Sequence, residues 1–304
     1  MKIILHCEPN TPPVPWKEFL EMAPRQSIAL DGYVIGRPMF DHKKLVMNAN
    51  HHEEVDRFST RCTSAQLALL IRTGLLESFS SSEPIHVYFN DCDQDVCLCI
   101  WLLQNIPIAR NIMNPVLNRI ITIEDMLDTT SGMYGFPPDM SGMEENAWIF
   151  EPYSIARSNG TLTRRTPNEF EMIIKVVGSR ISESIAGKGE RLALDTRYEV
   201  ISRHPKWCMV KETGLHARAG MFADGIKAFV SVRPRGDGVT TYSLGRSGIW
   251  IPFDIPLVIE KLNEKENTPR DKWGGGDTTG GSPRATGSAL SPKEVEETIS
   301  KVAE

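Results

Sequence analysis

Short apolar runs alternate with stretches of helical spacing through the first half of the chain. The runs of strand length lie at residues 2–5, 27–30, 46–49 and 86–89. Apolar residues recur every three or four positions, as in amphipathic helices, at residues 16–22 and 63–76. Residues 96–103 are predicted as a very apolar helix, and residues 120–126 are also predicted as helical. Strands that alternate with helices favour a mostly parallel sheet covered by helices. The pattern also predicts Thr63 or Ser64 as the cap of the helix at 63–76, and an exposed Glu124.

The pattern changes in the second half, where short β runs follow one another. They lie at residues 198–202, 207–211, 228–233 and 240–243, and the last two are joined by a turn signal at 235–238. Helices are predicted at 168–183, at 255–262 and after Ser291-Pro292, where Glu294 completes a capping box. Residues 132–160, rich in Gly, Met, Pro and Asn, are predicted as a long connection.

These patterns together predict an α/β protein of two domains, which a chain of 304 residues can accommodate. Residues 1–165 would form an α/β domain with a mostly parallel sheet, flanking helices and the long connection. Residues 166–304 would form a smaller α/β domain with a mixed sheet.

Polar side chains able to bind metal follow the predicted strands of the first domain. Asp31 follows one strand, His51 and His52 follow the next, and Asp91-Cys92-Asp93-Gln94-Asp95 follows the last. Ligands bind at the carboxyl ends of parallel strands, which meet at one edge of a sheet. Imidazole nitrogens and carboxylate oxygens are ligands for divalent transition metals, and two such ions serve phosphate-ester hydrolases. The sequence therefore predicts a two-metal site at this edge.

Several of these segments resemble motifs of the DHH phosphoesterases. Asn50-His51-His52, with Asp31 on the preceding strand, resembles the third motif of that family, and Asp128-Thr129-Thr130 resembles the fourth. The alternate aspartates at 91–95 resemble the first motif. The glycine-rich segment 274–284, with Gly245-Arg246 before it, resembles the family's substrate-binding domain. The resemblance covers most of the chain in outline.

This resemblance implies a metal-dependent hydrolase of phosphodiester or phosphoanhydride bonds in small nucleotide-type substrates. It implies two Mn²⁺ ions, or Mg²⁺, with His51, His52 and Asp93 as catalytic residues. The implied metal ligands are Asp31, Asn50, His51, His52, Asp91, Asp93, Asp95 and Asp128. The implied substrate-binding residues are Arg246, Gly275, Gly276, Arg284 and His216.

Two departures from the family pattern leave other functions open. The family's Asp-His-His is Asn50-His51-His52 here, and the alternate aspartates follow the histidine pair rather than the first strand. One alternative is a catalytically inactive protein that keeps the DHH fold and binds a nucleotide or phosphate. Another is an enzyme with a thiol nucleophile in the cysteine-rich segment 92–99, although no Cys/His motif supports it.

Charge and composition narrow the class of partner. The net charge of −5 disfavours a protein that coats long nucleic acid and leaves small phosphorylated ligands open. No apolar run is long enough to span a bilayer, and the six cysteines form no CxxC pair, which favours reduced thiols in a cytoplasmic protein. A homodimer is compatible with the sequence.

Overall fold

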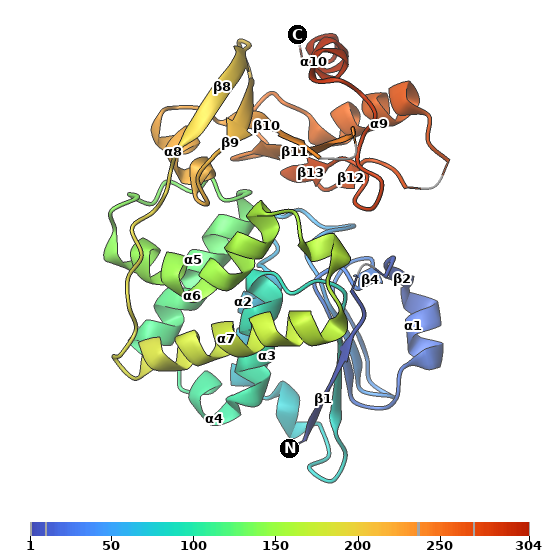
Figure 1. Ribbon diagram of the computed structural model, residues 1–304. Coiled ribbons are helices and arrows are strands. Elements are labelled where there is room, and N and C mark those ends of the chain that lie inside the picture. The colour runs from blue at the N-terminus through green and yellow to red at the C-terminus, as the bar shows by residue number, and fades with distance from the viewer. Residues whose placement is uncertain (1, 10, 236–237, 270, 304) are drawn as a thin grey trace. The chain divides into compact units, whose positions relative to one another are not determined.

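The computed structural model describes residues 2–9, 11–235, 238–269 and 271–303 (Figure 1). The chain forms two compact units, one of residues 1–125 and 144–192 and the other of residues 126–143 and 193–304. The boundary expected after residue 165 falls inside the first unit, because residues 144–192 pack with the N-terminal part of the chain.

The sheet of the first unit is mostly parallel, as predicted. Its strand order is β1 (Ile3–Cys7), β7 (Ile85–Phe89), β3 (Ser27–Leu30), β6 (Val46–Ala49) and β5 (Met39–Asp41). The first four strands run parallel, and β5 pairs with β6 in the antiparallel sense at the edge. A separate parallel pair joins β2 (Val14–Pro15) to β4 (Val34–Ile35). The carboxyl ends of β3, β6 and β7 therefore share one edge.

Helices cover both faces of this sheet (Figure 1). On β3, Ile28 and Leu30 belong to one apolar core and Ala29 to another, as the two-residue period of a strand requires. Helix α1 (Trp16–Met22) packs on the Ala29 side through Phe19. The opposite core includes residues from α2 (Thr63–Arg72), α3 (Gln94–Gln104), α5 (Pro115–Thr129), α6 (Ser141–Ser158) and α7 (Pro167–Ile185). The short helix α4 (Ile106–Ala109) contributes Ala109 to it.

The second unit is built on a mixed sheet, again as predicted. Its strand order is β12 (Gly274–Gly275), β13 (Thr279–Gly281), β11 (Thr240–Arg246), β10 (Ala228–Pro234), β9 (Cys208–Glu212) and β8 (Tyr198–Arg203). The β9–β10 pair is parallel and the other pairs are antiparallel. Helices α8 (Ala217–Ala223), α9 (Ile255–Glu266) and α10 (Pro292–Ser300) complete the unit. Two residues of the predicted β10–β11 turn, 236 and 237, lie outside the described residues.

Some local predictions were wrong. The stretch 132–160 is not a plain connection, because residues 141–158 form α6 with Ile149 and Phe150 fully buried. Helix α2 ends at Arg72 rather than residue 76, and Gly74 follows it with a positive φ of 96°. Glu124 was predicted to be exposed but is only 3 % exposed, because it lies on the inner side of α5. The capping box at Ser291 and Glu294 is confirmed.

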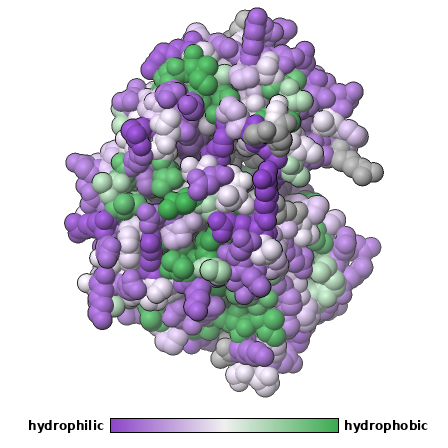
Figure 2. Space-filling model, viewed as in Figure 1, coloured by the Kyte–Doolittle hydropathy of each residue, from purple (hydrophilic) through white to green (hydrophobic). Residues whose placement is uncertain are grey.

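The described helices offer no membrane span, since none is both long and apolar enough. Hydrophobic and hydrophilic residues are interspersed on the face that Figure 2 shows.

Candidate metal centre

Asp31 is presented by a tight turn at the end of β3. Asp31 and Gly32 both have positive φ, 45° and 77°, and the Tyr33 N–H donates to the Leu30 carbonyl at 3.0 Å. Successive positive φ values are those of a type I′ turn, for which Asp-Gly is a favoured pair. The Asp31 N–H also donates to Ala49 O of the neighbouring strand at 2.9 Å. The turn therefore holds the Asp31 carboxylate beside the end of β6.

His51 and His52 are presented at the end of β6 by Asn50. The Asn50 Oδ1 accepts hydrogen bonds from the backbone N–H groups of His51 at 2.8 Å and His52 at 3.0 Å. Its Nδ2 donates to Val34 O at 3.2 Å and Gly36 O at 2.9 Å. Because a carbonyl oxygen has two lone pairs, both acceptor positions of this side chain are used. Asn50 therefore shapes the backbone, and the structure does not support it as a metal ligand.

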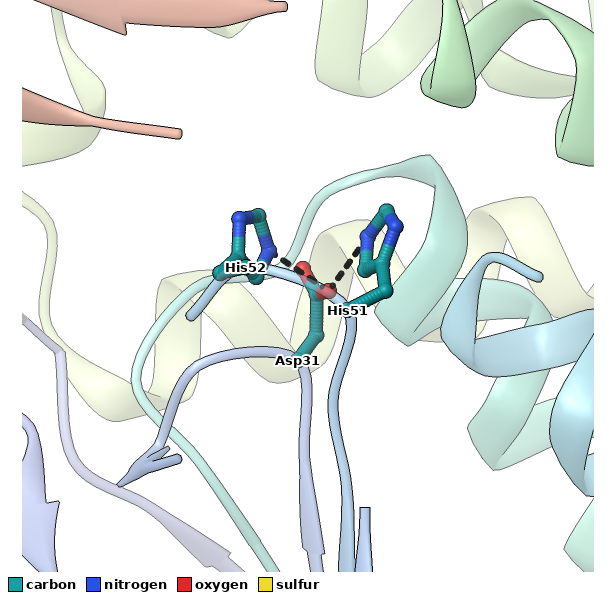
Figure 3. A group of neighbouring side chains, drawn as sticks. All are labelled: Asp31, His51 and His52. Atoms are coloured by element: carbon teal, nitrogen blue, oxygen red, sulfur yellow. Dashed lines mark hydrogen bonds and ion pairs between the residues drawn. The ribbon is translucent and has the colours of Figure 1, made fainter. Parts of the chain in front are cut away.

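The two imidazoles converge on one carboxylate oxygen (Figure 3). Asp31 Oδ1 lies 2.8 Å from His52 Nε2 and 3.2 Å from His51 Nε2. Ligand atoms of these three residues all lie within 4.8 Å of one another. Two ligands held about 2 Å from one ion lie up to about 4 Å apart, so these side chains could hold a metal ion after small shifts.

Because this group is largely buried, the charges of its side chains interact strongly. His51 is fully buried and Asp31 is 8 % exposed, while His52 is half-buried. Desolvation alone would raise the pKa of Asp31, but the charge and hydrogen bonds of His52 and His51 outweigh it and hold that pKa well below the usual value. The carboxylate is therefore ionised and available as an anionic ligand.

Asp95 joins the group through the N-terminus of α2. Its two oxygens accept the backbone N–H groups of Thr63 at 2.6 Å and Ser64 at 2.8 Å, and Oδ2 lies 3.9 Å from His51 Nε2. These carboxylate bonds replace the predicted Thr63 or Ser64 cap, since the α2 N-cap residue, Cys62, makes no side-chain capping bond. The positive end of the helix dipole stabilises a carboxylate there. Asp95 is thus held with its charge directed towards His51.

Asp91 and Asp93 lie beside this group, on the loop between β7 and α3. Asp93 is the N-cap of α3, where its Oδ1 accepts the Val96 N–H at 2.9 Å. Asp91 Oδ1 accepts the Cys92 N–H at 2.7 Å. Desolvation, reinforced by the negative charges of Asp31, Asp91 and Asp95, raises the pKa of Asp93 well above the usual value. The charges of Asp31, Asp91 and Asp95 therefore disfavour a further negative charge on Asp93, which a bound cation would stabilise.

Asp128 is the last of the implied metal ligands. It lies in the last turn of α5, within the residues assigned to the second unit. Its role as a metal ligand stays a prediction.

Two contributors to the site were missed from the sequence. Thr63 Oγ1 donates to Asp31 Oδ1 at 3.1 Å, which makes it a third group on that oxygen. Asp125 Oδ1 accepts the Cys62 N–H at 2.8 Å, beside the Asp95 bonds at the start of α2. Thr63 was predicted only as a helix cap and Asp125 was given no role, and the contacts span 32 and 63 residues of chain. Only the packing of α2 against β3 and α5 reveals them.

The predicted substrate-binding residues of the second unit have mostly structural contacts. Arg246 is 7 % exposed, and its guanidinium donates to the carbonyls of Asp277 at 2.6 Å, Ile249 at 3.3 Å and Ile251 at 3.2 Å. It therefore fastens two loops, and the structure does not support it as a phosphate clamp. His216 precedes α8, and its Nδ1 accepts the Asp195 N–H at 3.3 Å.

The glycine-rich segment forms a small β-ribbon rather than an open loop that could bind an anion. Gly275 has φ of 150° and faces Gly280 so closely that a Cβ would lie 2.4 Å from the Gly280 Cα. The Gly276 N–H donates to Thr279 O at 2.8 Å and closes the turn. The close approach of the two strands of the ribbon therefore explains the glycine at position 275. Arg284 is exposed and stays a candidate for phosphate binding.

The thiols do not offer a nucleophile. No two of the six cysteines form a disulfide. Burial raises the pKa of Cys7 to about 12 and raises the pKa values of Cys97 and Cys99 well above the usual value. Because the thiolate is the nucleophile, these thiols are inert at neutral pH. The thiol-enzyme alternative therefore has no support in the structure.

Comparison of the sequence with protein-family models gives no match, and comparison with curated proteins gives no significant match.

Proposed function

We propose that the protein is a metal-dependent phosphoesterase of the DHH type, acting on a small nucleotide-type substrate. The observation that carries this proposal is the convergence of His51 and His52 on one oxygen of buried Asp31. A buried carboxylate flanked by two imidazoles, with further carboxylates at the same sheet edge, is a set of ligands for a divalent ion.

The proposed cofactor is a pair of Mn²⁺ ions, or Mg²⁺. Asp31, His51 and His52 would hold one ion, and Asp91, Asp93 and Asp95 offer carboxylates for a second. Mixed nitrogen and oxygen ligands favour manganese over calcium. When bound, such ions supply Lewis acidity towards a phosphate oxygen and lower the pKa of water.

The side chains of His51 and His52 differ in how accessible they are to a substrate. His52 has a side chain 29 % exposed, whereas that of His51 is fully buried. His52 is therefore the group of this pair that can meet a substrate or carry a proton to solvent. His51, Thr63 and Asp95 would hold Asp31 in place and exclude water from its inner side. Arg284 of the second unit is the remaining candidate to bind a phosphate.

A catalytically inactive binding protein with the same fold is the second candidate. Asn50 favours it, because this residue replaces the aspartate of the family motif and uses its oxygen for backbone hydrogen bonds. Loss of one carboxylate leaves a metal site with less charge, which lowers its affinity. Such a protein would bind a nucleotide or phosphate without turnover.

A substrate panel separates the two candidates. The purified protein would be incubated with short oligonucleotides, cyclic dinucleotides, nucleoside polyphosphates and inorganic polyphosphate, each with Mn²⁺, Mg²⁺ or a chelator. The phosphoesterase predicts metal-dependent product that chelation abolishes. Saturable nucleotide binding with no product under any metal condition would support the binding protein instead.

A further inference from the structure

A groove on the first unit lies between α2 and α5, outside the candidate metal centre. It has a volume of about 170 Å³. Its floor is apolar, formed by Ala65 and Ala68 of α2 and Ile121 of α5. The remaining lining residues are Arg61, Leu69, Arg72, Asn118 and Thr122. None of these lining residues is acidic.

Exposed apolar side chains continue this surface beyond the groove. Leu69 on its rim is 53 % exposed, and Ile112 and Met113, in the segment before α5, are 62 % and 80 % exposed. The Asn118 Nδ2 donates to Ile112 O at 2.8 Å, which places this segment next to the groove. Contiguous exposed apolar side chains beside a groove mark an interaction surface more often than isolated ones.

Two arginines give the groove its charge. Arg72 Nε donates to Ala109 O at 3.1 Å and Nη2 to Asn118 Oδ1 at 2.7 Å, so its guanidinium is fixed by neutral oxygens and keeps its charge for a partner. Arg61 lies at the other end, with its side chain 61 % exposed and 3.3 Å from Asp125.

We propose that this groove binds an amphipathic helix of a partner protein, with an apolar stripe against Leu69 and acidic residues against Arg61 and Arg72. Charge complementarity favours an acidic partner, because two arginines line the groove and only Arg61 lies near a carboxylate, that of Asp125. The apolar floor and rim match the helix-in-groove mode of recognition, in which every third or fourth side chain of the helix is an anchor.

A second copy of this chain fits the groove less well. Two of its acidic helices, α9 and α10, already bury their apolar residues Val258, Leu262, Val295 and Ile299 in their own core. A symmetric contact of groove with groove would bring arginines together. Both arrangements oppose self-association through this surface.

A display library of helical peptides tests the proposal. Peptides would be selected on the full wild-type chain and counter-selected on Leu69→Glu, which changes an exposed side chain and keeps the fold. The control is Met172→Glu, a change of charge at an equally exposed apolar position of α7, 66 % exposed. We expect selected peptides to carry an apolar stripe with flanking Asp or Glu. Leu69→Glu should weaken their binding at least about tenfold, and Met172→Glu should leave it unchanged.

Three results would overturn the proposal. The selection could yield no peptide that depends on Leu69, or peptides that are basic rather than acidic. Sedimentation could also show a wild-type dimer that Leu69→Glu dissociates, which would assign the surface to self-association. Circular dichroism of both variants confirms that they are folded.

Discussion

Asn50 links local backbone geometry to the position of both histidines. Its amide donates to Val34 O and Gly36 O and its oxygen accepts two backbone N–H groups, a pattern that an aspartate cannot reproduce. A carboxylate would also meet Glu53, whose Oε2 lies 2.7 Å from the Asn50 Nδ2. The residue that departs from the family motif is therefore suited to its own surroundings.

Asn50→Asp should consequently destabilise the protein without improving metal binding. Loss of buried donors predicts a fall of roughly 1–3 kcal/mol in the free energy of unfolding. Urea denaturation and Mn²⁺ titration would measure the two effects, with Asn159→Asp, an exposed position, as the control. A variant with unchanged stability and tighter Mn²⁺ binding would show that Asn50 is a weakened ligand instead.

The buried thiol of Cys7 leads to a prediction about how its alkylation rate depends on pH. Burial raises the pKa of Cys7 to about 12, so its thiolate fraction stays small at neutral pH. The rate of alkylation at Cys7 should still rise about tenfold per pH unit between pH 9 and 10, whereas an ordinary thiol of pKa about 8.5 levels off there. Site-resolved mass spectrometry measures this rate, and the unfolded chain is the control. A plateau at Cys7 near pH 9 in the folded protein would contradict the burial argument.

The N-terminus of α2 is the element on which the candidate site depends. Its first N–H groups bind two carboxylates, Asp95 on one side and Asp125 on the other, and only Asp95 also approaches His51. The two aspartates are thus matched in their capping role and differ in their distance from the candidate metal ligands.

Asp95→Asn and Asp125→Asn should therefore separate capping from metal binding. Each should lower the free energy of unfolding by roughly 1–3 kcal/mol, because each loses a charged acceptor at a helix N-terminus. Asp95→Asn should also reduce bound Mn²⁺, measured after dialysis, and Asp125→Asn should not. Equal metal loss in both variants would mean that the effect comes from the helix and that Asp95 is no ligand.

The elements differ in how far the sequence predicted them. The strands at 27–30 and 46–49 and the helix at 16–22 were confirmed with their bounds, because each is a short apolar pattern with clear ends. Helix α6 was missed, since a glycine, a proline and charged residues obscure its periodicity. The meeting of Asp31, His51 and His52 followed from strand ends in a parallel sheet, whereas the contacts of Thr63 and Asp125 depend on tertiary packing alone. The structural contacts of Arg246 and Gly275 were not predicted, because a buried arginine and a β-ribbon resemble a phosphate loop in sequence.

At the scale of the whole molecule, charge bears on the size of the substrate. The chain has a net charge of −5, and a long nucleic acid would require many phosphate contacts. We predict hydrolysis of mono-, di- or oligonucleotide phosphates in preference to long strands, with a shallow dependence of KM on salt. Rates per end for a dinucleotide and a long single strand, measured across a series of salt concentrations, would check this. Equal rates per end, with a steep salt dependence, would contradict it.

The central claim is that Asp31, His51 and His52 form a metal site, and metal content tests it most directly. The measurement is elemental analysis of Mn²⁺ retained after dialysis by the wild-type protein and by His51→Ala/His52→Ala. A matched control is His6→Ala/His86→Ala, which removes another histidine pair of the same unit, hydrogen-bonded at 2.9 Å. We predict Mn²⁺ in the wild type and the control and its loss from the His51/His52 variant, with all three proteins folded by circular dichroism. Unchanged Mn²⁺ in the folded His51/His52 variant, or none in the wild type, would contradict the assignment.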